Sequence, residues 1–153
     1  MTLSIQSERF EIEEGFEISL QVPTAHTAQL LEAIYRTDTL RYGDYDRVSF
    51  TTAPGLQRFR SLPGGRNAAS ETVLEVQCEE LSFFVGSQEQ VMEVVQTVHD
   101  HHPYEEPVIV VRTVQRSLHR SGMDEDNPNK FWNRGPEDWV PEIHRNQSGD
   151  TNT

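Results

Sequence analysis

Hydrophobic and polar residues alternate near the start of the chain in a pattern that predicts a strand, a helix and a second strand. Residues 16–22 follow the two-residue period of a half-buried strand. Thr24 is a candidate N-cap for a helix whose apolar residues recur at helical spacing within 30–35. A turn at 42–45 interrupts this pattern, and residues 47–52 are expected to form the next strand.

The middle of the chain combines an irregular segment with another alternating run. Prolines, glycines and three arginines in residues 53–69 predict a loop that is long for a compact domain. Residues 72–78 alternate again, and residues 81–85 are expected to extend the same strand past a bend or bulge. This part of the chain therefore predicts one long strand that follows a long loop.

A second helix and a last strand complete the pattern. Ser87 and Gln90 match a capping box, and valines at helical spacing follow them. The helix must end before Pro103. Residues 108–111 are continuously apolar, which is typical of a buried central strand.

The order of these elements predicts an α+β fold of the ferredoxin-like type. Strand, helix, strand, strand, helix, strand gives a βαββαβ arrangement, with two helices on one face of a four-stranded antiparallel sheet. Residues 108–111 would then present apolar side chains on both sides of the sheet, so its second face needs a partner. Association with further copies of the chain is the simplest way to supply that partner.

Composition divides the 153 residues into three parts. A polar lead-in covers residues 1–15, the ferredoxin-like domain covers 16–113, and a polar tail covers 114–153. Both tryptophans lie in the tail, and a disordered tail is normally poor in aromatic residues. Residues 131–143 are therefore expected to dock on a folded surface.

Charge limits the classes of partner. The chain has 13 Lys and Arg against 25 Asp and Glu, a formal net charge of −12, which disfavours binding to nucleic acid or to anionic membrane surfaces. No apolar stretch is long enough to span a bilayer, and the first residues do not resemble a signal peptide. Together with the single Cys78, this predicts a cytoplasmic protein.

Histidines cluster at the end of the second predicted helix and form a candidate metal site. Imidazole and carboxylate groups suit Zn, Cu or Ni, and the candidate ligands are His99, His101, His102 and Glu106. The alternative is structural, because imidazoles near a helix C-terminus are favoured electrostatically without any ligand. Both interpretations remain open from the sequence.

Three arginines in the 53–69 loop form a candidate site for a small anion. Arg58, Arg60 and Arg66 accompany glycines whose backbone N–H groups could cradle a phosphate. The alternative is that these arginines pair with some of the acidic residues. Neighbouring Glu105 and Glu106 would point to opposite faces of a strand, so they cannot act as a paired acid and base.

Three short motifs together resemble a known family. They are Gly43-Asp44-Tyr45, Arg58-Phe59-Arg60-Ser61-Leu62-Pro63-Gly64 and His102-Pro103-Tyr104-Glu105-Glu106-Pro107. Residues 16–113 resemble the YqfO-type domain, which occurs alone and as an insert in Nif-three-like proteins, and which is similar in fold to the CutA and PII proteins. The resemblance implies a homotrimer. Tyr45, Tyr104 and Glu105, which lie in these motifs, join the three arginines as candidate ligand-binding residues. The alternative for Tyr104 is structural, with its ring packed beneath the neighbouring strand. The resemblance carries over no hydrolase chemistry, because the domain with the dinuclear metal site of the large relatives has no counterpart here.

The sequence therefore favours a non-enzymatic, oligomeric protein with a small-ligand-binding or regulatory role. Nucleophile elbows, dinucleotide fingerprints and zinc-binding spacings are absent from the sequence, and no catalytic residue is predicted. Two alternatives remain: a divalent-metal-binding protein that uses the cluster around His102, and a structural or partner-binding module that acts through the tail.

Overall fold

The computed structural model describes residues 2–135 and 141–145, and these residues form two compact units. Residues 2–5 and Ile12–Leu118 belong to the first unit, and Gln6–Glu11, 119–135 and 141–145 belong to the second. The expected docking segment 131–143 lies partly outside the described residues, because 136–140 are not among them.

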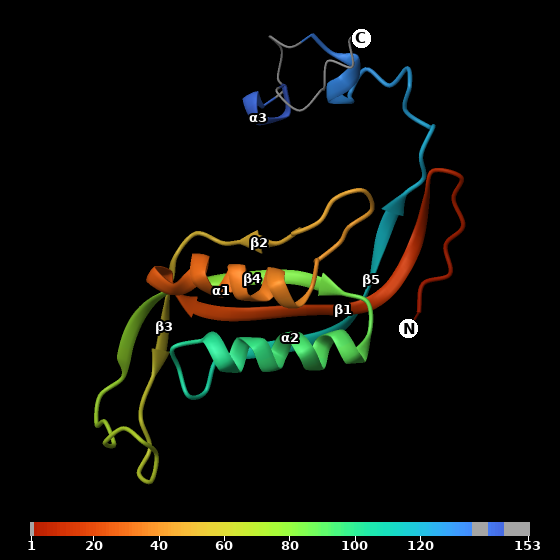
Figure 1. Ribbon diagram of the computed structural model, residues 1–153. Helices are drawn as coiled ribbons and strands as arrows, with labels where there is room; N and C mark the ends of the chain where they lie inside the picture. Colours follow the sequence, from red (N-terminus) through yellow and green to blue (C-terminus); the bar gives the residue numbers. More distant parts are fainter. Residues whose placement is uncertain (1, 136–140, 146–153) are drawn as a thin grey trace. The chain divides into compact units, whose positions relative to one another are not determined.

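The first unit is built on an antiparallel sheet, as predicted (Figure 1). Strand β4 pairs with β1 on one side and with both β2 and β3 on the other, and β5 lies beyond β1. Since β2 pairs with the end of β4 and β3 with its start, β2 and β3 together fill one position in the sheet. Five strands thus occupy the four positions of a ferredoxin-like sheet: β1 (Phe10–Pro23), β2 (Phe50–Thr51), β3 (Gly55–Phe59), β4 (Leu74–Val85) and β5 (Ile109–His119).

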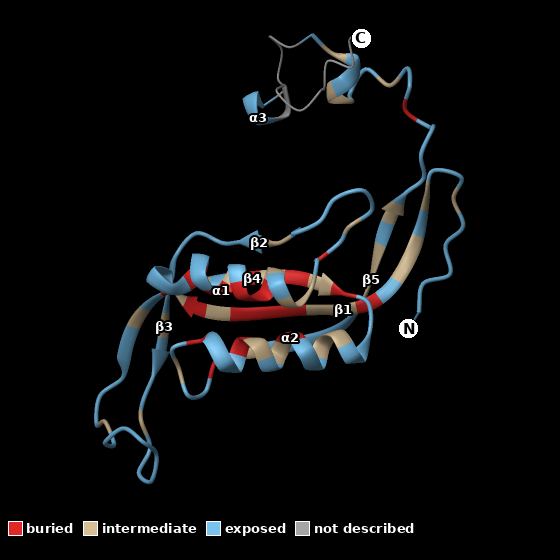
Figure 2. Cartoon of the chain, in the orientation of Figure 1, coloured by how far each residue is buried: buried red, intermediate tan, exposed pale blue. Residues whose placement is uncertain are grey.

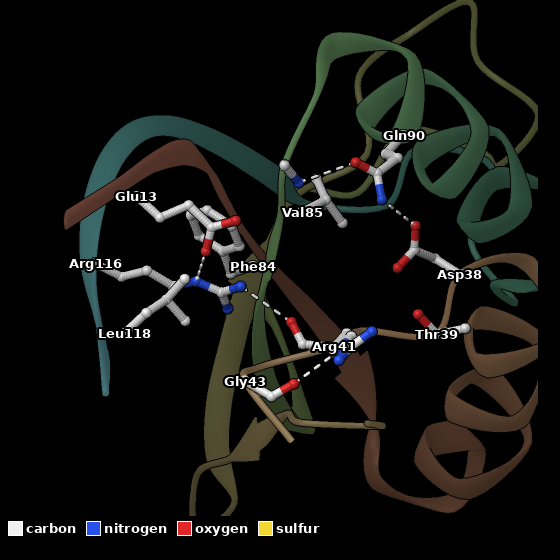
Figure 3. Close-up of a pocket in the computed structure, with 11 residues that line it drawn as sticks. Glu13, Asp38, Thr39, Arg41, Gly43, Phe84, Val85, Gln90, Arg116 and Leu118 are labelled. Carbon is white, nitrogen blue, oxygen red and sulfur yellow. Dashed lines mark hydrogen bonds and ion pairs between the residues drawn. The ribbon is translucent and has the colours of Figure 1, made fainter. Parts of the chain in front are cut away.

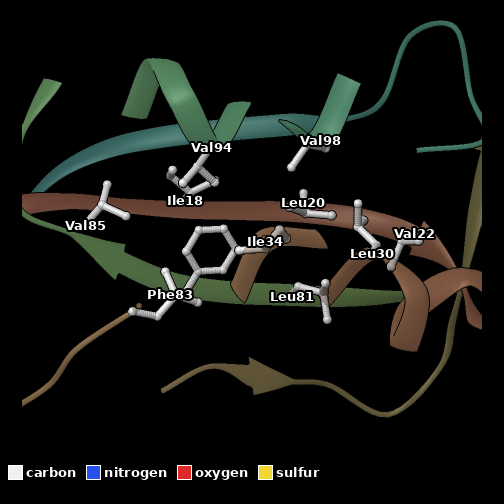
Figure 4. Close-up of a cluster of buried hydrophobic side chains, with 11 residues drawn as sticks. Ile18, Leu20, Val22, Leu30, Ile34, Leu81, Phe83, Val85, Val94 and Val98 are labelled. Carbon is white, nitrogen blue, oxygen red and sulfur yellow. The ribbon is translucent and has the colours of Figure 1, made fainter. Parts of the chain in front are cut away.

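Two helices, α1 (Thr27–Thr37) and α2 (Gln88–His101), pack on one face of the sheet and enclose the core. Alternate residues of β1 and β4 point toward the helices, and their side chains interlock with apolar residues from both (Figure 4). Each fully buried aliphatic side chain contributes about 1.5–3 kcal/mol to the stability of this core. The core consists of Ile18, Leu20, Val22, Leu30, Ile34, Leu40, Leu81, Phe83, Val85, Val94 and Val98.

The starts of the two helices differ in how far they match the predictions. The Oγ of Ser87 accepts a hydrogen bond of 3.2 Å from the backbone N–H of Gln90, so the predicted cap of α2 is confirmed. Thr24 does not cap α1, because it lies in a short 3-10 turn, η1 (Thr24–His26). The helix therefore starts at Thr27 with His26 as its N-cap, and His26 makes no side-chain capping bond.

Several strand boundaries also differ from the predictions. Strand β1 starts at Phe10, six residues before the alternating run. The predicted loop 53–69 contains strand β3, because pairing with β4 uses the backbone and does not require apolar side chains. The predicted strand 47–52 shortens to β2, since Arg47 has a left-handed backbone with φ of 53°.

The last strand, β5, is an edge strand and not the buried central strand that its apolar run suggested. Val108, Val110 and Val111 are each about 40% exposed, with values of 41%, 40% and 42%. Figure 2 shows the contrast with the buried central part of β1. The strand also continues to His119, beyond the predicted end. A run of apolar residues indicates that a strand presents apolar side chains on both faces of the sheet. It does not indicate whether the strand has a hydrogen-bonded neighbour on each edge.

The second unit is organised around the buried carboxylate of Asp124, whose residue is 2% exposed. Arg9 and Lys130 form ion pairs with this carboxylate, and the amide of Asn127 donates to it at 3.0 Å. Asn133 donates to the Asp124 backbone carbonyl at 2.8 Å. The unit also contains η2 (Phe131–Asn133) and α3 (Glu142–Arg145). None of the described helices has the length and apolar character needed to cross a membrane.

Candidate functional site

His102, the central residue of the predicted metal cluster, is 7% exposed and is hydrogen-bonded through both ring nitrogens. Its Nε2 lies 2.7 Å from the carbonyl oxygen of Gln21, and its Nδ1 accepts the backbone N–H of Tyr104 at 3.0 Å. This pattern requires a neutral ring with the proton on Nε2. Burial lowers the pKa of His102, the Gln21 carbonyl partly opposes that effect, and His26 and His99 add to the lowering.

The other candidate metal ligands do not converge on His102. The Nδ1 of His101 lies 2.9 Å from the Thr97 carbonyl oxygen, one turn back in its own helix. His99 and Glu106 are exposed. Over residues 2–135 and 141–145, no three His, Cys, Asp or Glu side chains are placed to hold a metal ion. The predicted donor set therefore does not fit a Zn, Cu or Ni site within one chain, because the ring at its centre has no free nitrogen.

Tyr104 packs in an aromatic and sulfur-containing cluster. Its ring centroid lies 5.1 Å from that of His102 and 6.4 Å from that of Phe59. Its side chain is hydrogen-bonded to that of Cys78, which is 5% exposed. Burial raises the pKa of both groups, and Cys78 raises the pKa of Tyr104 further. These contacts fasten the segment between α2 and β5 against β3 and β4.

The predicted arginine loop does not gather its three guanidinium groups around one point. Arg58 pairs with Glu75 across the β3–β4 hairpin at 2.9 Å, and Arg66 lies 3.7 Å from Glu105. Arg60 is exposed. Two of the candidate ligand-binding residues, Arg66 and Glu105, are therefore brought together as an ion pair. For Arg58 and Arg66 the geometry favours the alternative in which the arginines pair with acidic residues of the same chain.

Tyr45 lies in a tight loop at the other end of the sheet and is 67% exposed. Tyr42 and Tyr45 exchange two backbone hydrogen bonds, of 2.7 and 3.0 Å, around Gly43, whose φ is +59°. The loop closes through bonds from the N–H of Arg47 to the Thr39 carbonyl and from Val48 to Leu40. We refer to residues 38–48 as the Tyr42 loop.

Backbone strain is concentrated in the Tyr42 loop. Leu40 and Arg47 have φ of 48° and 53°, in the left-handed region that side-chain-bearing residues seldom adopt. Leu40 is held there because its side chain is buried in the core. Strained backbone often marks functional segments, so the surroundings of this loop are of interest.

A pocket of about 360 Å³ lies beside the Tyr42 loop (Figure 3). Side chains from five parts of the chain line it: Glu13, Asp38, Arg41, Phe84, Gln90 and Arg116. None of these residues was predicted from the sequence as a site residue. Apart from Asp38 and Arg41, which share the Tyr42 loop, they come from separate strands and a helix, so no local motif signals the pocket.

Arg116 forms one wall of the pocket, and its side chain is only 14% exposed. The guanidinium carbon lies 3.6 Å from the ring centroid of Phe84 and 4.0 Å from that of Tyr42, so the cation contacts both aromatic rings. Its Nε donates to Glu13 at 2.8 Å, and Nη2 donates to the Arg41 carbonyl at 3.0 Å. These bonds attach the Tyr42 loop to β5.

Asp38 forms the opposite wall, where α1 ends (Figure 3). One carboxylate oxygen accepts the backbone N–H of Leu40 at 2.8 Å, and the other accepts the side-chain amide of Gln90 at 2.8 Å. The Nε of Arg41 donates to the Gly43 carbonyl at 2.8 Å. The pocket therefore combines two guanidinium groups and two carboxylates whose positions are fixed by hydrogen bonds.

Comparison with solved structures finds this architecture elsewhere. A Bacillus cereus protein related to NIF3 matches with a TM-score of 0.59 and 19% sequence identity, over 71% of this chain and 28% of that protein. CutA from Synechococcus elongatus matches with a TM-score of 0.50 and 18% identity, over 71% of this chain and 90% of CutA. The fold is CutA-like. Neither a protein-family model nor a curated protein matches the sequence.

The comparisons confirm the resemblance at the level of the fold, since identities of 18–19% establish no more than that. The chain spans only 28% of the length of the Bacillus cereus protein, in contrast to its nearly complete coverage of CutA. The expected homotrimer and the small anionic ligand remain predictions.

Proposed function

We propose that this chain is a non-enzymatic protein that self-associates and binds a small ligand. The observation that carries the proposal is the edge strand β5, which ends the sheet while presenting half-exposed valines. An apolar edge strand, whose outer backbone N–H and C=O groups face away from the sheet, favours pairing with another strand. A homotrimer, as the CutA-like fold suggests, would supply that strand.

The face of the sheet opposite the helices supports the same conclusion. Ile109 packs against the core, so its neighbours Val108 and Val110 point to the open face. Phe50 also lies on this face, because it is opposite Ser82 in a register that directs Leu81 to the core, and it is 67% exposed. Burying these side chains against another copy would remove several apolar groups from water.

Small-ligand binding is supported by the pocket and by the CutA comparison. The pocket beside the Tyr42 loop, at about 360 Å³, falls in the size range of sites for small molecules. The similar CutA from Synechococcus elongatus was solved in complex with a Bis-Tris molecule. We therefore assign ligand binding to the pocket beside the Tyr42 loop and self-association to β5.

Light scattering coupled to size exclusion tests the self-association. We expect the wild type to show a mass three times the chain mass of 17.6 kDa, and Val110→Lys to show the mass of one chain. Met92→Lys is the matched control, because Met92 is 63% exposed on the outer side of α2. A wild type that remains monomeric at all concentrations would contradict the proposal, and so would an unchanged mass for Val110→Lys.

A further inference from the structure

The pocket beside the Tyr42 loop retains hydrogen-bonding capacity after its internal bonds are counted. Arg41 uses Nε for the Gly43 carbonyl, and among the described residues neither of its terminal nitrogens has a hydrogen-bond partner. Each oxygen of Asp38 accepts one hydrogen bond, although a carboxylate oxygen can accept two. Donors and acceptors are therefore both available to a ligand.

The polar groups that line the pocket lie on different sides of it. In Figure 3, Asp38 and Gln90 lie on one side, Glu13 and Arg116 lie on the other, and Arg41 lies between them. Internal bonds hold these groups in place, so a ligand would meet a prearranged set of charges. The ring of Phe84 and the side chain of Leu118 add an apolar portion to the lining.

The balance of charges limits the class of ligand. Two carboxylates and two guanidinium groups leave the lining close to neutral, so a ligand with a single charge would leave part of it unmatched. The chain as a whole carries a net charge of −12, which repels simple anions. A molecule with one positive and one negative group matches both the lining and the field of the protein.

We propose that this pocket binds a small zwitterion of the α-amino acid class. The carboxylate of the ligand pairs with the free end of Arg41, where two parallel N–H···O bonds can form. The ammonium group faces Asp38, and the ligand side chain lies toward Phe84. The proposal names the ligand class for the small-ligand binding proposed above, but it uses residues of one chain and does not depend on self-association.

Isothermal titration of the full chain with each proteinogenic amino acid tests the proposal. We expect at least one amino acid to bind with a dissociation constant below about 1 mM. Its methyl ester lacks the carboxylate and its N-acetyl form lacks the ammonium group, so each should bind about tenfold more weakly or worse. Failure of every amino acid to bind below about 1 mM would overturn the proposal.

Matched variants locate the binding. Arg41→Ala should weaken binding by about tenfold, because it removes the partner of the ligand carboxylate. Arg36→Ala is the control, since Arg36 is exposed in the last turn of α1 and bonds to the Glu32 carbonyl outside the pocket. Equal effects of the two variants would overturn the assignment, as would N-acetyl amino acids that bind as well as free ones. Light scattering on the same samples reports the oligomeric state separately.

Discussion

The Nε2 of His102 donates a hydrogen bond of 2.7 Å to the carbonyl oxygen of Gln21, and this bond ties the end of α2 to strand β1. The two residues are 81 positions apart in the sequence. Because the ring proton is on Nε2, Nδ1 has a lone pair that accepts the N–H of Tyr104. A single neutral ring therefore holds both β1 and the segment that leads into β5. The histidine thus has a structural role at the centre of the most distinctive motif of the chain.

Stability should fall in mild acid because of His102. Burial lowers the pKa of His102 below its ordinary value of 6.5, whereas the unfolded chain keeps the ordinary value. The unfolded state therefore binds the proton first, and the contribution of the neutral ring is complete above pH 6.5 and is lost as the pH falls through the lowered pKa. Urea unfolding from neutral pH downward measures this loss.

The control is His101→Gln, which removes an exposed histidine from the next position. His101→Gln should lose as much stability on acidification as the wild type does. His102→Gln should have a free energy of unfolding about 1–3 kcal/mol lower than the wild type at neutral pH. On acidification, its stability should fall less than that of the wild type. An identical pH profile for the wild type and His102→Gln would contradict this account.

Gly15→Ala should destabilise the first unit by crowding. A Cβ at Gly15 would lie 2.2 Å from Cζ of Phe84 and 2.6 Å from the carbonyl oxygen of Val85. One of these atoms must move, at a cost of about 1–3 kcal/mol in the free energy of unfolding. Gly55→Ala, also in a strand, is the control, since no atom lies within 4 Å of the added Cβ. Denaturant unfolding should separate the two variants, and similar midpoints would exclude the crowding.

Arg116→Lys should destabilise the attachment of the Tyr42 loop. Lysine keeps the charge but loses the planar group that contacts Phe84 and Tyr42, and it cannot bond to both Glu13 and the Arg41 carbonyl in the same geometry. We expect a loss of about 1–2 kcal/mol in thermal or urea unfolding. Arg112→Lys, at a half-exposed arginine of the same strand, should have a smaller effect. The reverse order would show that the ring contacts contribute little.

Asp124→Asn should loosen the second unit. The substitution replaces the carboxylate with a neutral amide of similar size, so the ion pairs with Arg9 and Lys130 are lost. Amide hydrogen exchange should become several-fold faster at Asn127, Lys130 and Asn133, whose N–H groups form successive turns after Asp124. Exposed Glu125→Ala should leave these rates unchanged. Unaltered exchange in Asp124→Asn would mean that the ion pairs do not order this segment.

Local patterns in the sequence were sufficient for the elements that form the core. The alternation in residues 16–22 and the cap at Ser87 report burial and hydrogen bonding within a few residues, and the structure contains both features. The order of the elements then limited the fold to one arrangement. Strand β3 escaped prediction because its pairing with β4 depends on the backbone, while its side chains are mostly exposed.

The pocket could not be predicted in the same way. Glu13, Asp38, Arg41, Gln90 and Arg116 each look like ordinary surface residues in the sequence. They converge only after α1 and α2 have packed on the sheet and the Tyr42 loop has closed. The histidine cluster showed the opposite behaviour, since neighbours in the sequence separated in the structure into a buried ring and exposed ones.

The exposed edge of β5 makes solubility depend on whether an assembly that forms through this edge closes into a ring. A strand edge that can pair with another chain leaves a new free edge whenever the assembly stays open, and such an assembly can grow without limit. A closed ring uses every edge and stops growth at a fixed size. For the self-association proposed above, the angle between neighbouring copies would therefore decide between a closed particle of fixed size and a fibre.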